Sequence, residues 1–219
     1  MKSEANLLKR RAFLSKGVAV SALSLGSPGL WATSSVTNAE KSLFVIGPLE
    51  GYTPQIGTLV SMLNYNRQTI IDSVNGLSIS EIDYLLDGKA NTIAGLVMHL
   101  GAVEKFYQIN TFEGRQEFND EEKKVWNSAM NLGDEGRKNI KGKEIAYYLN
   151  LLAEVRQKTL ELLKKKDDKW LLAIDPEWSK KENLNTYWKW FHVCEHESNH
   201  RGQIAFLTAR LPGDKPGKD

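Results

Sequence analysis

Three of the four histidines in the 219-residue chain fall in one short stretch, at His192, His196 and His200. The stretch has helical periodicity, and residues four apart on an α-helix are offset by only about 40° around its axis. The three imidazoles therefore share one stripe of a helix, with neighbouring Cβ atoms about 5–6 Å apart. Two imidazoles one turn apart can hold one cation, as in the His-Glu-x-x-His helices of zinc enzymes. A lone histidine would favour an ordinary solvated face, whereas three in register predict a metal site.

The third ligand must come from elsewhere in the chain. Peptidases with the His-Glu-x-x-His motif take it from downstream, but the 19 residues after His200 contain no His, Glu or Cys. The remaining histidine, His99, lies in the middle of a different predicted helix whose face is otherwise apolar. If it faced His196 and His200 across a helix bundle, it would complete a three-histidine site.

The spacing of apolar residues predicts the elements that would position these histidines. Four long amphipathic helices are expected, over about 54–74, 92–113, 143–166 and 186–210, the second of them capped by Asn91. The polar stretch 115–141 reads as a long crossover with one short helix at about 121–130, and 167–184 as a second connection. With no strand-like alternation and no internal repeat, the pattern predicts an all-α protein, a four-helix bundle with long crossover connections.

The formal net charge of +2 is unevenly distributed along the chain. The first 32 residues carry five basic residues and one acidic residue, a net charge of +4, which leaves −2 for the rest. A mildly acidic body gives no electrostatic reason to expect nucleic acid as a partner. The single cysteine, Cys194, excludes an internal disulfide.

The amino terminus is typical of an export signal. Lys9-Arg10-Arg11-Ala12-Phe13-Leu14 resembles the twin-arginine motif, although Lys9 stands where Ser or Thr is usual, and the apolar run that follows is too short to span a bilayer. We expect export to the periplasm and no stable membrane span after processing; a basic tail on a cytosolic protein is the alternative. The expected organisation is a signal peptide at 1–32, a linker at 33–50, the helical body at 51–211 and a charged tail at 212–219.

His99 together with His196-Glu-x-x-His200-Arg-Gly-Gln-Ile204 resembles the DinB/YfiT-like metalloenzymes. The resemblance covers about residues 50–211. It implies a bundle of up-down-down-up topology that binds a divalent metal such as zinc or nickel through His99, His196 and His200. It also implies a small-molecule substrate, since some members transfer low-molecular-weight thiols to electrophiles or isomerise with such a thiol as cofactor. It does not imply DNA polymerase activity, and the export signal departs from common members.

Four neighbouring residues receive predicted roles. Gln203 lies about 20° from His196 around the helix and is expected to orient a ligand. Glu197 is expected to accept a proton or to support a metal ligand, with an outward salt bridge to Arg201 as the alternative. His192 is expected at the rim of the site, and Gly202 is expected to permit close helix packing.

The preferred function is a metal-dependent enzyme, a thiol S-transferase or a hydrolase, that activates water or a thiol at the three histidines. The alternative is a non-catalytic periplasmic protein that binds a metal or another ligand. A peptidase that uses Glu197 is the least favoured reading, because a downstream third ligand is lacking. A monomer and a homodimer are both compatible with the sequence.

Overall fold

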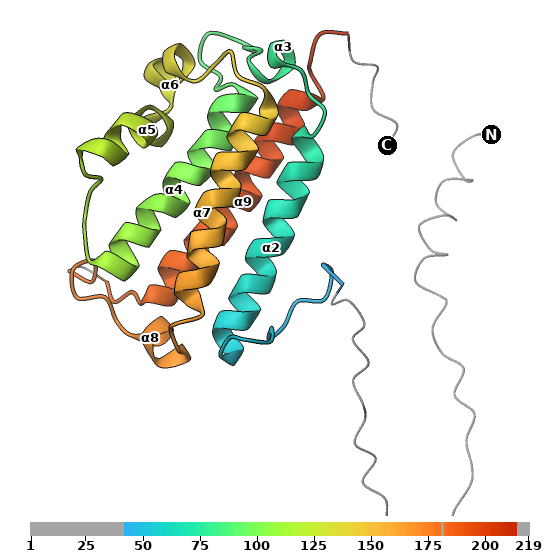
Figure 1. Cartoon of the computed structure of the whole chain (residues 1–219). Helices are drawn as coiled ribbons and strands as arrows, with labels where there is room; N and C mark the ends of the chain where they lie inside the picture. Colours follow the sequence, from blue (N-terminus) through green and yellow to red (C-terminus); the bar gives the residue numbers. More distant parts are fainter. Residues whose placement is uncertain (1–41, 181, 214–219) are drawn as a thin grey trace, which may run out of the picture. The chain divides into compact units, whose positions relative to one another are not determined.

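The computed structural model describes residues 42–180 and 182–213 (Figure 1), all within a unit that runs from Glu40 to Asp219. The predicted signal peptide lies outside the described residues, as do parts of the predicted linker and tail. The described residues form eight helices: α2 (Pro54–Val74), α3 (Ile79–Ile82), α4 (Ile93–Glu113), α5 (Asp120–Asn131), α6 (Gly133–Asn139), α7 (Ile145–Leu163), α8 (Asp168–Leu172) and α9 (Thr186–Thr208). The only β-type pairing among them is an isolated bridge between Ile174 and Asn185, so the all-α prediction is confirmed.

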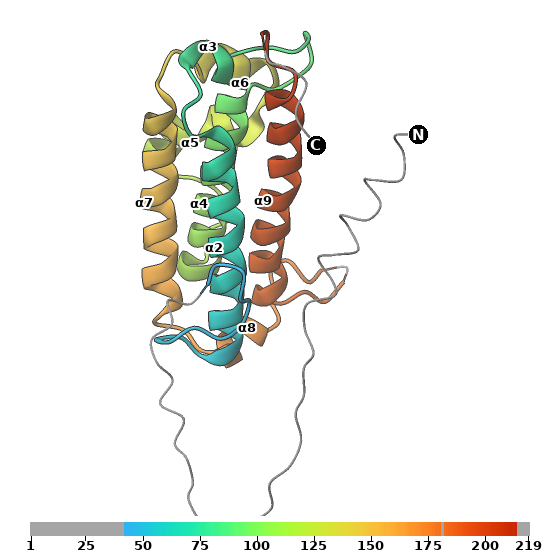
Figure 2. The ribbon, with the colours of Figure 1, turned by 90° about the vertical axis from the view of Figure 1, so that its right-hand side faces the viewer.

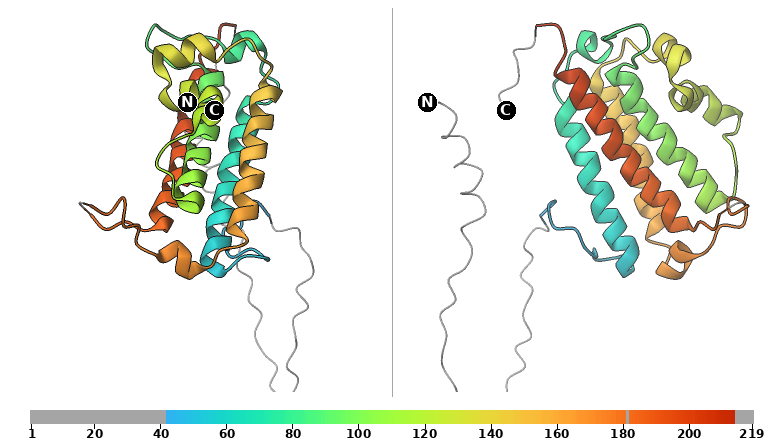
Figure 3. Two further views of the ribbon diagram at one scale, coloured as in Figure 1. Left: turned by 60° about the vertical axis from the view of Figure 1, so that its left-hand side comes forward. Right: turned by 180° about the vertical axis from the view of Figure 1, so that it is seen from behind.

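The long helices α2, α4, α7 and α9 lie side by side. Helix α7 lies between α4 and α2 in Figure 1, and α9 lies between α2 and α4 in the view from behind (Figure 3). Helices α2 and α9 run upward in Figure 1 and α4 and α7 downward, and the view turned by 90° shows the four roughly aligned (Figure 2). The short helices α3 and α6 lie at one end, α8 lies at the other, and α5 lies against α4.

None of the helices in residues 42–180 and 182–213 combines the length and the apolarity that a membrane span requires.

Local signals explain where the long helices begin and end. Helix α2 starts with Pro54 at its first position, and the Asp168 carboxylate accepts backbone N–H groups of Gln55 and Ile56 across 3.1–3.2 Å. Helix α9 is capped by Asn185, whose side chain accepts the backbone N–H of Trp188 across 2.9 Å.

Helix α4 corrects one sequence prediction. Its cap is Thr92, whose Oγ1 accepts the backbone N–H of Gly95 across 2.9 Å, and the predicted cap, Asn91, is wrong. Asn91 instead accepts the backbone N–H of Gly133 across 3.1 Å, which ties the start of α4 to α6. Either residue type can cap a helix, so the sequence alone does not separate two such neighbours.

The predicted crossovers contain more structure than expected. The helix predicted at 121–130 is α5, but a second helix, α6, follows at once, and α8 lies in the second connection. Leu132, with a φ of 53°, interrupts the helical conformation between α5 and α6. Gly133 and Gly136 both lie within α6, in the stretch that was predicted as a crossover.

The core holds two apolar clusters and, buried with them, a layer of charged side chains. Each long helix contributes one member: Arg67 from α2, Glu104 from α4, Arg156 from α7 and Glu197 from α9. Arg156 pairs with Glu104 across 2.8 Å and with Glu197 across 2.9 Å, and Arg67 pairs with Glu104 across 2.7 Å and also binds Glu197. These four side chains, which we call the ion layer, are buried and carry no net formal charge.

The remaining polar atoms of the ion layer are largely satisfied by the helices around them. Arg67 Nη1 donates to the carbonyl oxygen of Leu152 across 3.0 Å, and Arg156 Nη1 donates to that of Leu63 across 2.8 Å. Burial by itself would raise the pKa of Glu104, but the charges of Arg156 and Arg67 outweigh it and lower that pKa to about 2. Removing one member of a buried, hydrogen-bonded ion pair typically costs about 3–5 kcal/mol.

Candidate metal centre

Helices α4 and α9 bring three imidazoles together. Nε2 of His196 lies 3.2 Å from Nε2 of His99 and 2.9 Å from Nε2 of His200, and the three candidate ligand atoms all lie within 4.8 Å of one another. Nitrogens bound tetrahedrally to zinc at about 2.0–2.1 Å are separated by about 3.3 Å. The two short separations therefore match a shared ion in scale. The structure brings together all three residues that the sequence predicted as ligands.

Hydrogen bonds on the outer nitrogens fix which ring nitrogens carry protons. His99 Nδ1 lies 2.8 Å from the carbonyl oxygen of Ala129 on α5, which can only accept, so this nitrogen carries the proton. His200 Nδ1 lies 3.0 Å from Oε1 of Gln203, which favours the same tautomer. Both Nε2 atoms then present lone pairs toward His196, whose single Nε2–H can satisfy only one of them.

The donor set therefore fits a divalent ion better than it fits a hydrogen-bonded cluster. With the proton of His196 on Nδ1, three lone pairs converge on one point, as neutral imidazole ligands require. That Nδ1 atom is buried and has no hydrogen-bond partner among the described residues.

Burial keeps these imidazoles neutral. It lowers the pKa of His99 to about 4, despite the hydrogen bond to Ala129, which acts in the opposite direction. Burial, reinforced by the neighbouring histidines, lowers the pKa of His196 to about 3. The pKa of His200 is also lowered, again chiefly by burial. All three side chains are consequently available as ligands near neutral pH.

The third histidine of the α9 stripe, His192, lies beside the group of three without joining it. Its ring stacks on His196, with centroids 5.5 Å apart and planes 9° apart, and on its other neighbour, Trp188, also at 5.5 Å. Its Nδ1 lies 2.9 Å from a carboxylate oxygen of Glu195. This stacked column packs against a face of the His196 ring, in keeping with the rim position predicted for His192.

Glu197 lies in the core, 1% exposed, and belongs to the ion layer. The alternative of an outward salt bridge to Arg201 is wrong, because Arg201 donates instead to Oγ1 of Thr69 across 3.2 Å. None of the hydrogen bonds described for Glu197 reaches His99, His196 or His200. Its catalytic role stays a prediction, and its observed contacts are those of a residue that holds α9 in place.

Gln203 and Gly202 follow the last histidine on α9. Gln203 contacts His200 through Oε1, as described, and its Nε2 donates to Oδ1 of Asn199 across 3.2 Å. Gly202 was predicted to permit close helix packing, and it does not. A Cβ at this position would have no neighbouring atom within 4 Å. That prediction was wrong because no other helix approaches Gly202 closely enough to contact a Cβ there.

Several contributors to the centre were missed at the sequence level. The Ala129 carbonyl was missed because a backbone group leaves no mark in composition. Arg67, Glu104 and Arg156 did carry a signal, since each interrupts the apolar positions of a predicted helix. A charged residue at such a position is rarely buried unless it is paired. The presence of three of them therefore indicated that they form ion pairs in the core.

Comparison with known proteins agrees with this geometry. Residues 58–213 match the family model described as Mycothiol-S-transferase, a DinB/YfiT-like family, and the match contains all three histidines of the centre. No curated protein matches the sequence. Because the family match covers well over half of the chain, and because the resemblance noted from the histidine motif points the same way, the chain belongs to the mycothiol S-transferase family.

Proposed function

We propose that the protein is a divalent-metal-dependent thiol S-transferase, built as a DinB-like four-helix bundle of up-down-down-up topology. The observation that carries the proposal is the convergence of the Nε2 atoms of His99, His196 and His200. The family match supports a low-molecular-weight thiol, mycothiol or a close analogue, as the thiol substrate. Zinc and nickel are the proposed ions, since neutral imidazoles suit both.

His99, His196 and His200 would hold the divalent ion, which when bound would lower the pKa of a substrate thiol and so supply thiolate near neutral pH. The transfer joins the thiol sulfur to an electrophilic carbon. The thiol proton passes to solvent, and the leaving group departs from that carbon with the electron pair of its bond. The atoms and electrons of this transfer balance in the same way whichever metal is bound and whichever substrate binds first.

The protein's own residues contribute position and protonation state. The Ala129 carbonyl holds the His99 ring, Gln203 holds the His200 ring, and the stacked ring of His192 packs against His196. Such contacts typically affect metal affinity by about 10–100-fold. The ion layer fixes α9 relative to α4, which keeps the three nitrogens within reach of one ion.

Elemental analysis of the purified full chain tests the proposal, beside His99→Ala and His196→Ala as variants and His192→Ala as a matched control. We expect about one equivalent of metal in the parent and in His192→Ala, and loss of metal in the other two. Unchanged metal content in both ligand variants would overturn the proposal. A second measurement tests turnover with mycothiol and an electrophile: a metal-loaded protein that transfers no thiol would refute the transferase and leave the hydrolase and the non-catalytic binder.

Export to the periplasm by the twin-arginine-like segment is part of the proposal as well. Its support is the sequence of residues 9–16, which lie outside the described part of the chain. Cell fractionation of the natural protein and of an Arg10→Lys, Arg11→Lys variant tests it. Recovery of both proteins from the cytoplasm would refute export. It would also remove the conflict between an exported enzyme and a thiol substrate that is found in the cytosol.

A further inference from the structure

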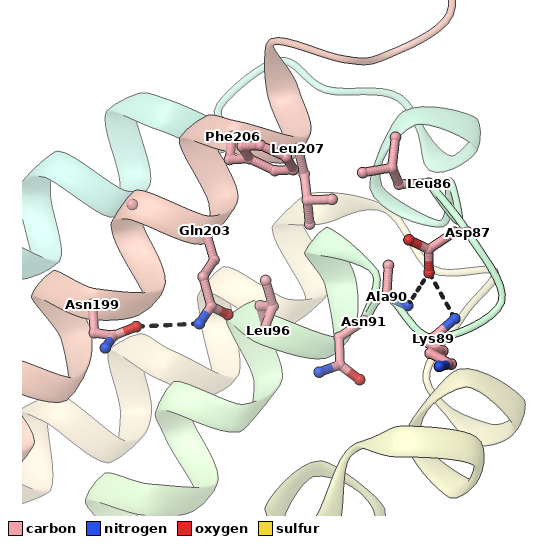
Figure 4. A pocket seen from close by; sticks show the side chains of 11 residues that line it. Leu86, Asp87, Lys89, Ala90, Asn91, Leu96, Asn199, Gln203, Phe206 and Leu207 are labelled. Carbon is pink, nitrogen blue, oxygen red and sulfur yellow. Dashed lines mark hydrogen bonds between the residues drawn. The ribbon is translucent and has the colours of Figure 1, made fainter.

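A pocket of about 560 Å³ lies beside the metal centre, between α4, α9 and the loop that precedes α4 (Figure 4). Leu96 on α4 precedes His99 by three residues, and Gln203 on α9 follows His200 by three. Each step is about 4.5 Å along a helix axis. The pocket therefore lies next to the parts of α4 and α9 that carry the candidate metal ligands. Gln203 joins the two regions directly, since it lines the pocket and contacts His200 Nδ1 across 3.0 Å.

The wall of the pocket includes a glycine that packing does not explain. Gly202 lies within α9, and a Cβ added there would meet nothing within 4 Å. A glycine inside a helix costs about 0.5–1 kcal/mol relative to alanine. Because no neighbouring side chain requires this glycine, its effect is to leave the α9 backbone bare where it borders the pocket. Close approach of a ligand to the backbone is a use that glycine serves.

The lining is mostly apolar and carries little net charge. Its apolar part comes from Leu86, Leu96, Phe206 and Leu207. Phe206 is 49% exposed although it is a large aromatic residue, and the guanidinium of Arg210 lies 3.6 Å from the centroid of its ring.

The polar part of the lining consists of uncharged amides and one pair of opposite charges. The amides belong to Asn91, Asn199 and Gln203 (Figure 4). Asp87 and Lys89 oppose each other in charge, and Asp87 already accepts the backbone N–H groups of Lys89 and Ala90 across 2.7 and 2.8 Å. The pocket thus suits an uncharged molecule with an apolar body and one or two hydrogen-bonding groups, and it suits an anion or a polyhydroxylated sugar poorly.

We infer that this pocket binds the electrophilic acceptor of the transfer, an uncharged aromatic or aliphatic molecule, with its backbone contact at Gly202. The inference rests on the proposed function. In the step that follows, the thiol sulfur bonds to the acceptor carbon that points toward the metal centre. The bond from that carbon to its leaving group breaks, the leaving group takes the electron pair, and the thiol proton goes to solvent.

The first test measures binding of an unreactive probe, 1,3-dinitrobenzene, to the full chain by equilibrium dialysis. Gly202→Leu fills the pocket without a clash and favours the helix, so the variant is expected to fold and to bind the probe at least 10-fold more weakly. Phe206→Ala, a second variant, is expected to bind it several-fold more weakly. Parent-like affinity in both variants overturns the inference. Dialysis of an unreactive probe requires neither metal nor turnover, so the test stands even if the proposed function fails.

The second test uses the metal-loaded protein and distinguishes a pocket that binds the acceptor from a pocket that binds the thiol. With 1-chloro-2,4-dinitrobenzene as acceptor, Gly202→Leu is expected to raise the KM for the acceptor at least 10-fold and to leave the KM for the thiol within about twofold. A rise in the KM for the thiol alone would assign the pocket to the thiol and overturn the inference. Metal content equal to that of the parent shows that the centre itself is intact.

Discussion

Oε1 of Glu197 accepts a hydrogen bond from Nη2 of Arg156 across 2.9 Å, and this contact joins α9 to α7 inside the core. Glu197 directly follows His196, a member of the candidate metal centre, and it also binds Arg67 on α2. The residue next to a metal ligand is therefore tied to two other helices. From this relationship we expect Glu197 to act on the centre through the position of α9.

Glu197→Gln is predicted to lower the free energy of unfolding by about 3–5 kcal/mol, because it leaves the Arg67 and Arg156 guanidinium groups without one counter-charge. Urea unfolding measures the change. Glu195→Gln is the matched control, since Glu195 is exposed on the same helix and should change stability by less than about 0.5 kcal/mol. A general-base role for Glu197 predicts a large loss of kcat in the folded fraction. A kcat near that of the parent would rule that role out.

Gln203→Leu is predicted to weaken metal affinity by about 10–100-fold while leaving the fold intact. The amide oxygen of Gln203 is what fixes the His200 ring with its proton on Nδ1, and leucine cannot accept that hydrogen bond. Competition with a metal chelator measures the affinity. Asn199→Ala is the control, because Asn199 contacts only the other end of the Gln203 amide, and an equal loss in both variants would contradict the prediction.

Acid should destabilise the protein through Glu104. Its pKa is about 2 in the folded chain, below the ordinary value of 4.5, because Arg156 and Arg67 outweigh the effect of burial. The stabilisation is therefore fully present above about pH 4.5 and is lost as the pH falls through about 2, on the order of 3 kcal/mol in all. Thermal unfolding between pH 2 and 6 measures it. A Glu104→Gln variant should show a flatter profile, and an unchanged slope would contradict the assignment.

Asp168→Ala is predicted to lower the free energy of unfolding by about 0.5–2 kcal/mol. The Asp168 carboxylate caps the start of α2 through the backbone N–H groups of Gln55 and Ile56, although it lies more than a hundred residues away in the chain. Urea unfolding checks the value. Lys169→Ala on the same short helix serves as the control and should leave stability nearly unchanged.

The long helices were predictable because the apolar spacing of each is a local property of the chain. Their starts were less certain: Thr92 and Asn91 are adjacent and both able to cap, and only the contact of Asn91 with Gly133 separates them. Helices α6 and α8 escaped prediction because short helices bury too few apolar residues to show a period.

The candidate site was likewise predictable in some parts and not in others. The stripe His196–His200 follows from spacing on one helix, and His99 was found because an isolated histidine on an apolar face needs a partner. The surroundings of Glu197 were not found, since helical spacing tells which residues share a face and not which helix they meet. Gly202 was misjudged for the same reason: the choice between helix packing and contact with substrate depends on which side of α9 meets its neighbours.

The ion layer also limits how freely the three imidazoles can be transplanted. Glu104 on α4 and Glu197 on α9 bind the same two arginines, Glu104 five residues after His99 and Glu197 directly after His196, so the axial offset of the two helices is set close to the ligands themselves. Grafted alone onto another helical scaffold, His99, His196 and His200 would lose that alignment. A design that borrows this centre must therefore carry seven side chains, the three nitrogen donors and the four charges.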